Sequence, residues 1–170
     1  MENFQSILRY TANSIERNNI IIWKIDSQER FDELFIFLFD SDVKLAIRAA
    51  DAIEKVSLTS IDYFKRHRES ILKLLDTADN NQIKWNLALI VSRLPLRKKE
   101  LGKVWDKLTN WATDRSQSKV VRVNSVHGLF NLLSQCPELS VDFHLTVSQI
   151  ETENLPSLKA RLRLLNLASR

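Results

Sequence analysis

The chain has 170 residues, of which 44% are hydrophobic and 27% charged, and its formal net charge is +4. This balance is that of an ordinary globular domain and excludes an intrinsically disordered chain. Two Gly and three Pro are too few for the turns of an all-β fold, and no apolar run approaches the roughly 20 residues that span a bilayer, so no membrane segment is expected.

Apolar residues at helical spacing predict a short first helix, over Phe4–Arg17, followed by alternating first and second helices. The first helices are expected over Gln28–Phe39, Asp62–Ala78, Leu96–Thr113 and Val141–Glu151. Each second helix is expected to begin at a residue whose side chain can accept a hydrogen bond from free backbone amides. These capping residues are spaced by 38, 38 and 39 positions, and they are Asp42, Asn80, Ser118 and Ser157.

This regular spacing predicts an all-α fold, a right-handed α-solenoid of about four and a half helical hairpins with a period near 38 residues. Stacked hairpins bury faces that no single hairpin could cover. We expect one domain over residues 1–170, with an N-terminal half repeat over residues 1–19. The full repeats are expected over residues 20–57, 58–95, 96–134 and 135–170.

The stretch LFIFLFDSDVKLAIRAADAIEKV, Leu34 to Val56, resembles a HEAT repeat. It has a first helix, an acidic turn and a second helix that reads A-A-x-A-I, and the later repeats resemble it more loosely. Tetratricopeptide and ankyrin units, with periods of about 34 and 33 residues, would drift out of register. The resemblance implies a binding scaffold and no activity, because HEAT-like solenoids mostly act as scaffolds.

No residue pattern indicates catalysis, a metal site or a cofactor. The three histidines, His67, His127 and His144, are expected on different helices, without metal-ligand spacing. The two glycines cannot form a phosphate-binding loop, and the single Cys136 cannot form an internal disulfide. We therefore expect a non-enzymatic protein. Because the start MENFQSILRY also lacks the pattern of a secretory signal, we expect it in the cytoplasm.

The second helices are expected to line the concave wall of the solenoid, and on two of them this wall is unusually apolar. Trp85, Leu89, Val123 and Phe130 would form one contiguous patch, with His127 in the same rows and Arg93 beside it. An exposed apolar patch usually marks an interaction site. The alternative is that tight curvature or an end segment of the chain covers it.

Basic residues gather in the second half of the chain. Residues 1–85 hold 12 Lys and Arg against 14 Asp and Glu, whereas residues 86–170 hold 13 against 7. This excess marks either a solvated face or a surface for phosphates or an acidic protein. The candidate contact residues are Arg97, Lys98, Lys99, Lys119 and Arg122.

Together, an apolar centre and a basic edge favour a protein or peptide partner, acidic and helical, or a second copy of the chain. The alternative is nucleic-acid binding, because the alkylated-base DNA glycosylases are HEAT-like proteins that hold a duplex on a basic concave face. The first half of the chain is acidic, however, and the catalytic residues of that family find no match here. Protein binding is therefore the favoured function.

Ala50 and Ala88 are expected to be buried between helices, because both lie five residues after the first apolar position of their second helix. Replacing Ala50 by Leu should overpack the core and lower the free energy of unfolding by roughly 1 to 3 kcal/mol. Chemical denaturation followed by circular dichroism measures this change. An unchanged midpoint would contradict the helical register.

Overall fold

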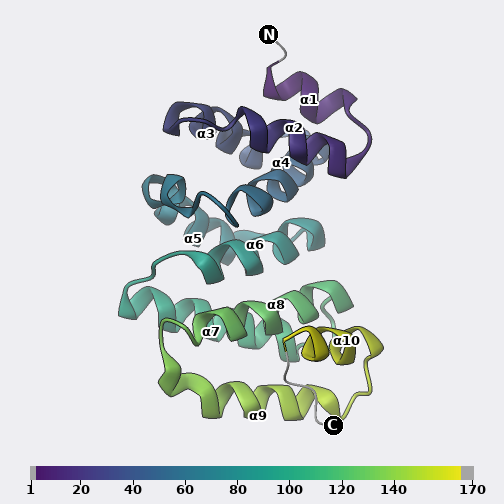
Figure 1. Cartoon of the computed structure of the whole chain (residues 1–170). Coiled ribbons are helices and arrows are strands. Elements are labelled where there is room, and N and C mark those ends of the chain that lie inside the picture. The colour runs from purple at the N-terminus through teal and green to yellow at the C-terminus, as the bar shows by residue number, and fades with distance from the viewer. Residues whose placement is uncertain (1–2, 166–170) are drawn as a thin grey trace. The chain divides into compact units, whose positions relative to one another are not determined.

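The computed structural model describes residues 3–165, and every regular element over these residues is a helix (Figure 1). The predicted all-α class is therefore confirmed. The helices cluster into two compact units, an N-terminal unit of residues 1–70 and a C-terminal unit of residues 71–170. The handedness of the stack, its exact period and the repeat boundaries stay predictions.

The N-terminal unit contains four α-helices and two short 3-10 helices. They are α1 (Phe4–Tyr10), α2 (Ser14–Lys24), α3 (Gln28–Phe35), η1 (Ile36–Phe39), α4 (Val43–Val56) and η2 (Ile61–His67). Asp42 caps α4 as predicted, because its side chain accepts the backbone N–H of Lys44 at 3.0 Å. Helix α5 (Arg68–Thr77) follows η2 directly.

The expectation of a single helix over Phe4–Arg17 is wrong. The chain leaves the helical conformation at Thr11, and α2 begins after Asn13, whose side chain accepts the backbone N–H groups of Ile15 and Glu16. An Asn followed three residues later by Glu is a typical helix start. The Ile15 side chain, in the first turn of α2, is 71% exposed.

Aromatic rings fill the core of the N-terminal unit between α3 and η2. Phe31 is fully buried, and its ring centroid lies 4.5 Å from that of Phe64. Beside them, the ring of His67 stacks on Phe35, with 3.9 Å between centroids, and its Nε2 lies 2.5 Å from the carboxylate of Asp32. Stacked rings and this polar pair hold the 3-10 helix against α3.

The C-terminal unit contains the second helices α6 (Asn81–Arg93), α8 (Lys119–Leu132) and α10 (Pro156–Leu164). Its first helices are α7 (Lys98–Thr113) and α9 (Ser140–Glu151), the latter preceded by the 3-10 helix η3 (Pro137–Leu139). The side chains of Asn80 and Ser118 cap α6 and α8 as predicted. Ser157 does not cap α10, because Pro156 already occupies the first helical position, where its missing N–H costs nothing.

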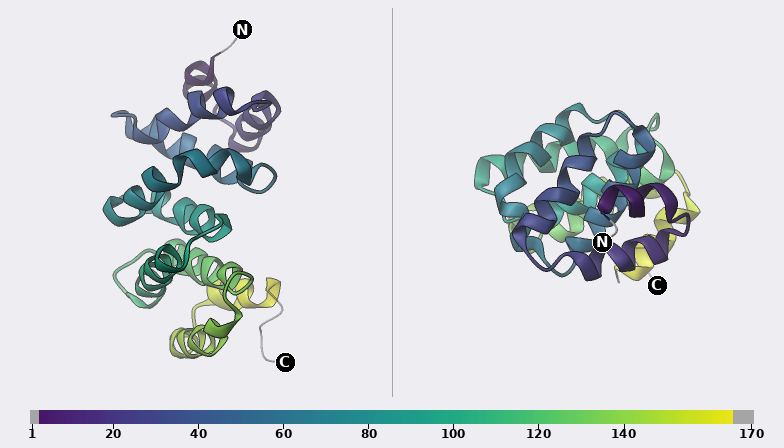
Figure 2. Two further views of the ribbon diagram at one scale, coloured as in Figure 1. Left: turned by 90° about the vertical axis from the view of Figure 1, so that its left-hand side faces the viewer. Right: turned by 90° about the horizontal axis from the view of Figure 1, so that it is seen from above.

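Helix α8 is the centre of this unit and packs against both α6 and α7. The left view of Figure 2 looks nearly along the axes of α7, α8 and α9. The backbone of α8 lies close to that of α6 at Gly128, where a Cβ atom would lie 2.6 Å from the carbonyl oxygen of Ala88 and 2.8 Å from Leu108 Cδ1. Ala88, and Ala50 of the N-terminal unit, are fully buried as predicted.

Replacing Gly128 by Ala should destabilise the protein by about 1 to 3 kcal/mol, because the added methyl group has no space against the backbone of α6. Gly102 is the matched control, since it also lies inside a helix and a Cβ there would meet nothing within 4 Å. Gly102→Ala should stabilise the protein by up to about 1 kcal/mol through helix propensity. The close approach would be contradicted if Gly128→Ala and Gly102→Ala raised the free energy of unfolding by the same amount.

Candidate functional site

The apolar residues predicted to bind a partner all lie on α6 and α8, which run side by side. Asn131 near the end of α8 donates through Nδ2 to the Ser92 hydroxyl of α6 at 3.0 Å. The exposure of these residues differs from one to the next. Trp85, His127 and Phe130 are half-buried, whereas Leu89 and Val123 are only 8% and 6% exposed.

The prediction of a contiguous accessible apolar patch is therefore wrong at Leu89 and Val123. Sequence spacing assigned one open side to each second helix, but α8 has α6, α7, α9 and α10 packed around it. The ring of Phe130 lies 6.0 Å from that of Phe143 of α9, so part of its surface is also covered. Trp85 and Phe130 are the large apolar residues of the predicted set that stay partly exposed.

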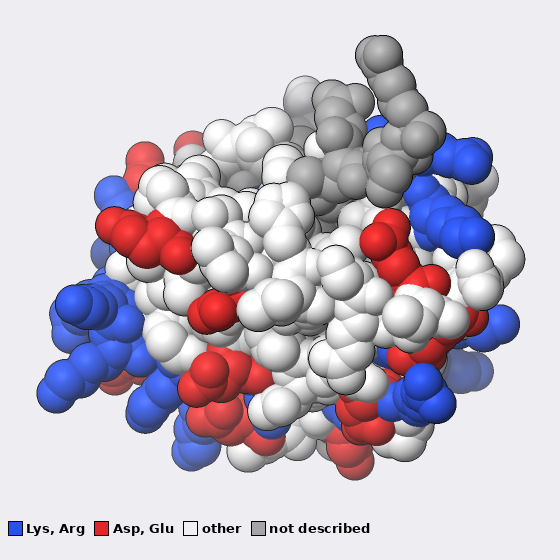
Figure 3. Space-filling view, turned by 90° about the horizontal axis from the view of Figure 1, so that it is seen from below, with Lys and Arg blue, Asp and Glu red and all other residues white. Residues whose placement is uncertain are grey.

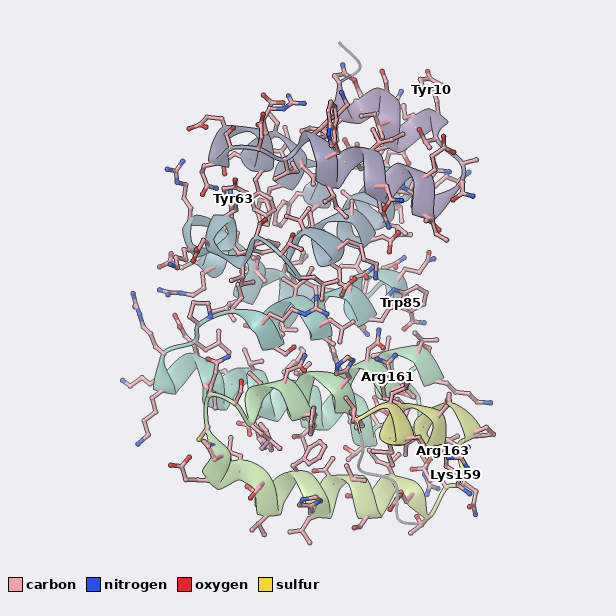
Figure 4. All side chains as sticks on the ribbon, viewed as in Figure 1. Tyr10, Tyr63, Trp85, Lys159, Arg161 and Arg163 are labelled. Atoms are coloured by element: carbon pink, nitrogen blue, oxygen red, sulfur yellow. The ribbon has the colours of Figure 1, made fainter. Side chains whose placement is uncertain are left out.

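A chain of polar contacts links Trp85 to α10 through Asn124 of α8. Asn124 Nδ2 donates to the carbonyl oxygen of Trp85 at 3.2 Å, and Arg161 Nη2 donates to Asn124 Oδ1 at 3.1 Å. Arg161 Nη1 lies 2.6 Å from His127 Nδ1. Because a guanidinium group only donates, His127 Nδ1 accepts this hydrogen bond, and the imidazole carries its proton on Nε2. Figure 4 shows Trp85 and Arg161 on the same side of the C-terminal unit.

Arg122 was a candidate for contacting phosphate or an acidic partner, and the structure excludes it from that role. It is 4% exposed, and its Nε donates to the carbonyl oxygen of Ala112 at 2.9 Å. Its two terminal nitrogens donate to the two carboxylate oxygens of Glu153, each at 2.9 Å. This guanidinium therefore ties α8 to the segment before α10 and presents no charge to a ligand.

The hydrogen bonds from Arg122 lower the pKa of Glu153 below its usual value of 4.5, and the positive charges of Arg122 and Arg115 act in the same direction. Arg115 itself is exposed, with its Nε 3.3 Å from Glu153 Oε1. The ionised carboxylate is the form that binds Arg122 and Arg115. The contacts of Glu153 with these two arginines therefore stabilise the fold when Glu153 is charged.

The remaining basic candidates lie on the surface. Arg97, Lys98 and Lys99 are exposed at the start of α7, and Lys119 is exposed at the start of α8. Arg93 is half-buried at the end of α6. Cations in the first turn of a helix oppose its dipole, so the positions of Lys98, Lys99 and Lys119 do not serve helix stability.

The sequence interpretation missed Asn124, Glu153 and Arg161. The sequence does contain a pattern that points to these contacts. Each second helix of this unit has a Lys or Arg one residue after its first apolar position. Two of these bases bond to the segment before the next second helix: Lys84 Nζ donates to Gln117 Oε1 at 3.2 Å, and Arg122 bonds to Glu153. The third, Arg161, bonds back to α8 instead.

No arrangement in the described part of the chain indicates bond-making chemistry. Residues 3–165 contain no group of three or more His, Cys, Asp or Glu side chains placed to hold a metal ion. Cys136 Sγ donates to Glu138 Oε2 at 3.2 Å, and this hydrogen bond raises the pKa of the thiol, which makes it less reactive. None of the helices over residues 3–165 combines the length and hydrophobicity of a bilayer-spanning segment.

The family model of the HEAT repeat domain matches residues 4–166, almost the whole chain. The chain belongs to the HEAT repeat family. Proteins of this family are helical-repeat scaffolds that commonly bind other proteins and generally lack catalytic activity. Comparison with curated proteins and with solved structures gave no match.

Replacing Glu153 by Gln should lower the free energy of unfolding at pH 7, because the buried Arg122 guanidinium then lacks its counter-charge. The lowered pKa of Glu153 means that its contribution is complete above pH 4.5 and is lost as the pH falls through the folded-state pKa. The variant should thus lose less stability than the parent between pH 7 and pH 3. Denaturation at several pH values measures this, with Glu151→Gln as a control that should follow the parent.

Proposed function

We propose that this HEAT repeat protein is a non-enzymatic scaffold that binds a protein partner on the α6, α8 and α10 side of its C-terminal unit. The observation that carries the proposal is the half-buried Trp85, which keeps part of its surface exposed on a helix whose following residues, Asn86 to Ser92, are all buried. A large aromatic side chain with a free face gives much contact area at small entropic cost, and tryptophan is enriched among the residues that dominate binding energy.

The charge around Trp85 favours an acidic partner. Arg161 is joined to the Trp85 backbone through Asn124, and the exposed Lys159 and Arg163 belong to the same helix α10 (Figure 4). Lys119 is exposed on α8. An acidic helical segment would place carboxylates near these cations and an apolar residue against the indole. Self-association through this surface would need an acidic, helical part of the second copy.

Nucleic-acid binding is the second candidate, and the exposed Arg97, Lys98 and Lys99 at the start of α7 favour it. Three consecutive cations at a helix N-terminus suit a phosphate group, because the free backbone N–H groups point the same way. The two candidates differ in their salt dependence. Phosphate contacts release counterions, so the affinity for a short duplex would fall steeply between 50 and 200 mM salt, by about 10³ or more for six contacts.

Trp85→Ala tests the protein-binding proposal once partners are captured from the native cell and one is purified. The variant should keep its helical circular dichroism spectrum and bind this partner at least about 2 kcal/mol more weakly. Trp23→Ala is the matched control, because Trp23 is also a helical tryptophan but is 82% exposed on α2. It should leave the affinity unchanged.

Three results would contradict the proposal. The first is equal affinity of the parent and Trp85→Ala for the partner. The second is a loss of thermal stability in Trp85→Ala near the roughly 3 to 5 kcal/mol of a truncated core tryptophan. The third is steeply salt-dependent duplex binding, lost in an Arg97, Lys98 and Lys99 triple alanine variant, with no protein partner captured.

A further inference from the structure

A groove of about 520 Å³ lies between the first helices α7 and α9 of the C-terminal unit. Trp105, Asp106 and Thr109 line it from α7, and Asp142 and Leu145 line it from α9. Residues that are adjacent, or three or four positions apart, share one face of a helix. One face of α7 and one face of α9 therefore form the two walls of the groove. The groove shares no residue with the Trp85 surface.

Two carboxylates line the groove, one from α7 and one from α9. The side chains of Asp106 and Asp142 are exposed, and neither forms a hydrogen bond or an ion pair within residues 3–165. Among the residues that the structure describes, no Lys or Arg lines the groove, and α9 contains none. This is a local reversal of charge, because residues 86–170 as a whole carry 13 basic and 7 acidic residues. Two unpaired carboxylates on facing helices favour a cation between them.

Apolar surface continues from the groove along α9. Leu145 and Val141, one helical turn apart, are 65% and 66% exposed, and the indole of Trp105 is largely buried at the base. The Thr109 hydroxyl, also lining the groove, is buried and finds no hydrogen-bond partner in the described part of the chain. Figure 3, which views the α9 end of the C-terminal unit, shows an uncharged centre with acidic residues across it and basic residues toward the edge.

We propose that the groove between α7 and α9 binds a basic amphipathic segment of a partner protein. A Lys or Arg side chain of this segment lies between Asp106 and Asp142, and its apolar residues cover Leu145 and Val141. Charge complementarity selects this occupant, because an acidic segment would meet two like charges and an uncharged one would leave both carboxylates unpaired. The groove therefore takes a partner opposite in charge to the one proposed for Trp85, and it does not depend on that proposal.

The probe is a fluorescein-labelled helical peptide about five turns long, with Leu along one face and Lys on both flanks. A second peptide carries Glu in place of Lys. Fluorescence anisotropy should show saturable binding of the Lys peptide and none of the Glu peptide. The double variant Asp106→Asn, Asp142→Asn should weaken binding by about tenfold or more, since each charge-assisted contact is lost. Leu145→Ser should also weaken binding without changing the fold, because Leu145 is 65% exposed.

The matched control is Asp76→Asn, Asp79→Asn, which removes two exposed carboxylates from the same unit outside the groove. It should bind the Lys peptide like the parent. If the groove variant and the control variant weakened binding of the Lys peptide equally, the peptide would be attracted by net charge only, and the proposal would be overturned. The proposal would also be overturned if the parent did not bind the Lys peptide. Self-association of the parent that the groove variant abolishes, seen by sedimentation, would make a second copy the occupant and would also overturn it.

These outcomes are separate from those of the Trp85 experiment. The groove variant should keep the Trp85-dependent partner, and Trp85→Ala should keep the Lys peptide. A cross-effect in which either variant loses both ligands, with its helical spectrum intact, would contradict the assignment of two independent surfaces.

Discussion

The close approach of α8 to α6 at Gly128 is the constraint on which the C-terminal unit depends. Only a residue without a side chain allows the α8 backbone to lie against the carbonyl oxygen of Ala88. With α6 this near on one side, α7, α9 and α10 pack around the remaining surface of α8. A helix packed in this way has few open positions, and this determines which of its residues are available for binding.

Burial of α8 requires partners for its polar side chains, because an unpaired polar group inside a protein costs more than a hydrogen bond returns. The Ser125 hydroxyl donates to the Val121 carbonyl oxygen on its own helix, at 2.8 Å. Arg122 and Asn124 instead reach neighbouring segments, and both are bonded to residues more than 30 positions away. These contacts fix how α6, α8 and α10 are placed along one another, so residues that look like binding groups in the sequence hold the repeats together.

The charged residues near Trp85 differ in sign from those that line the groove between α7 and α9. The surface with Trp85 carries cations from α10 and from the start of α8, whereas the charged residues that line the groove, among those the structure describes, are Asp106 and Asp142. Such a division suits a scaffold that brings two different partners together, since each side repels the partner of the other. It also explains why net charge, read over the whole chain, says little about either surface.

The sequence by itself determined the helical elements, the repeat family and most helix starts. Asp42, Asn80 and Ser118 could be recognised because a cap bonds to amides two or three residues away, and the buried Ala50 and Ala88 because a helical period is local information. The break at Asn13 is also encoded locally, because Asn13 caps α2 and Glu16 follows three residues later.

Only the tertiary structure decided which side chains of the second helices are open. Leu89 and Val123 occupy positions that an isolated hairpin would expose, and Arg122 has the sequence environment of a surface cation. Their burial follows from the packing of α8 among its neighbours and from Glu153, which lies 31 residues beyond Arg122. Such contacts depend on how distant helices meet in space, and no spacing within one helix contains that information.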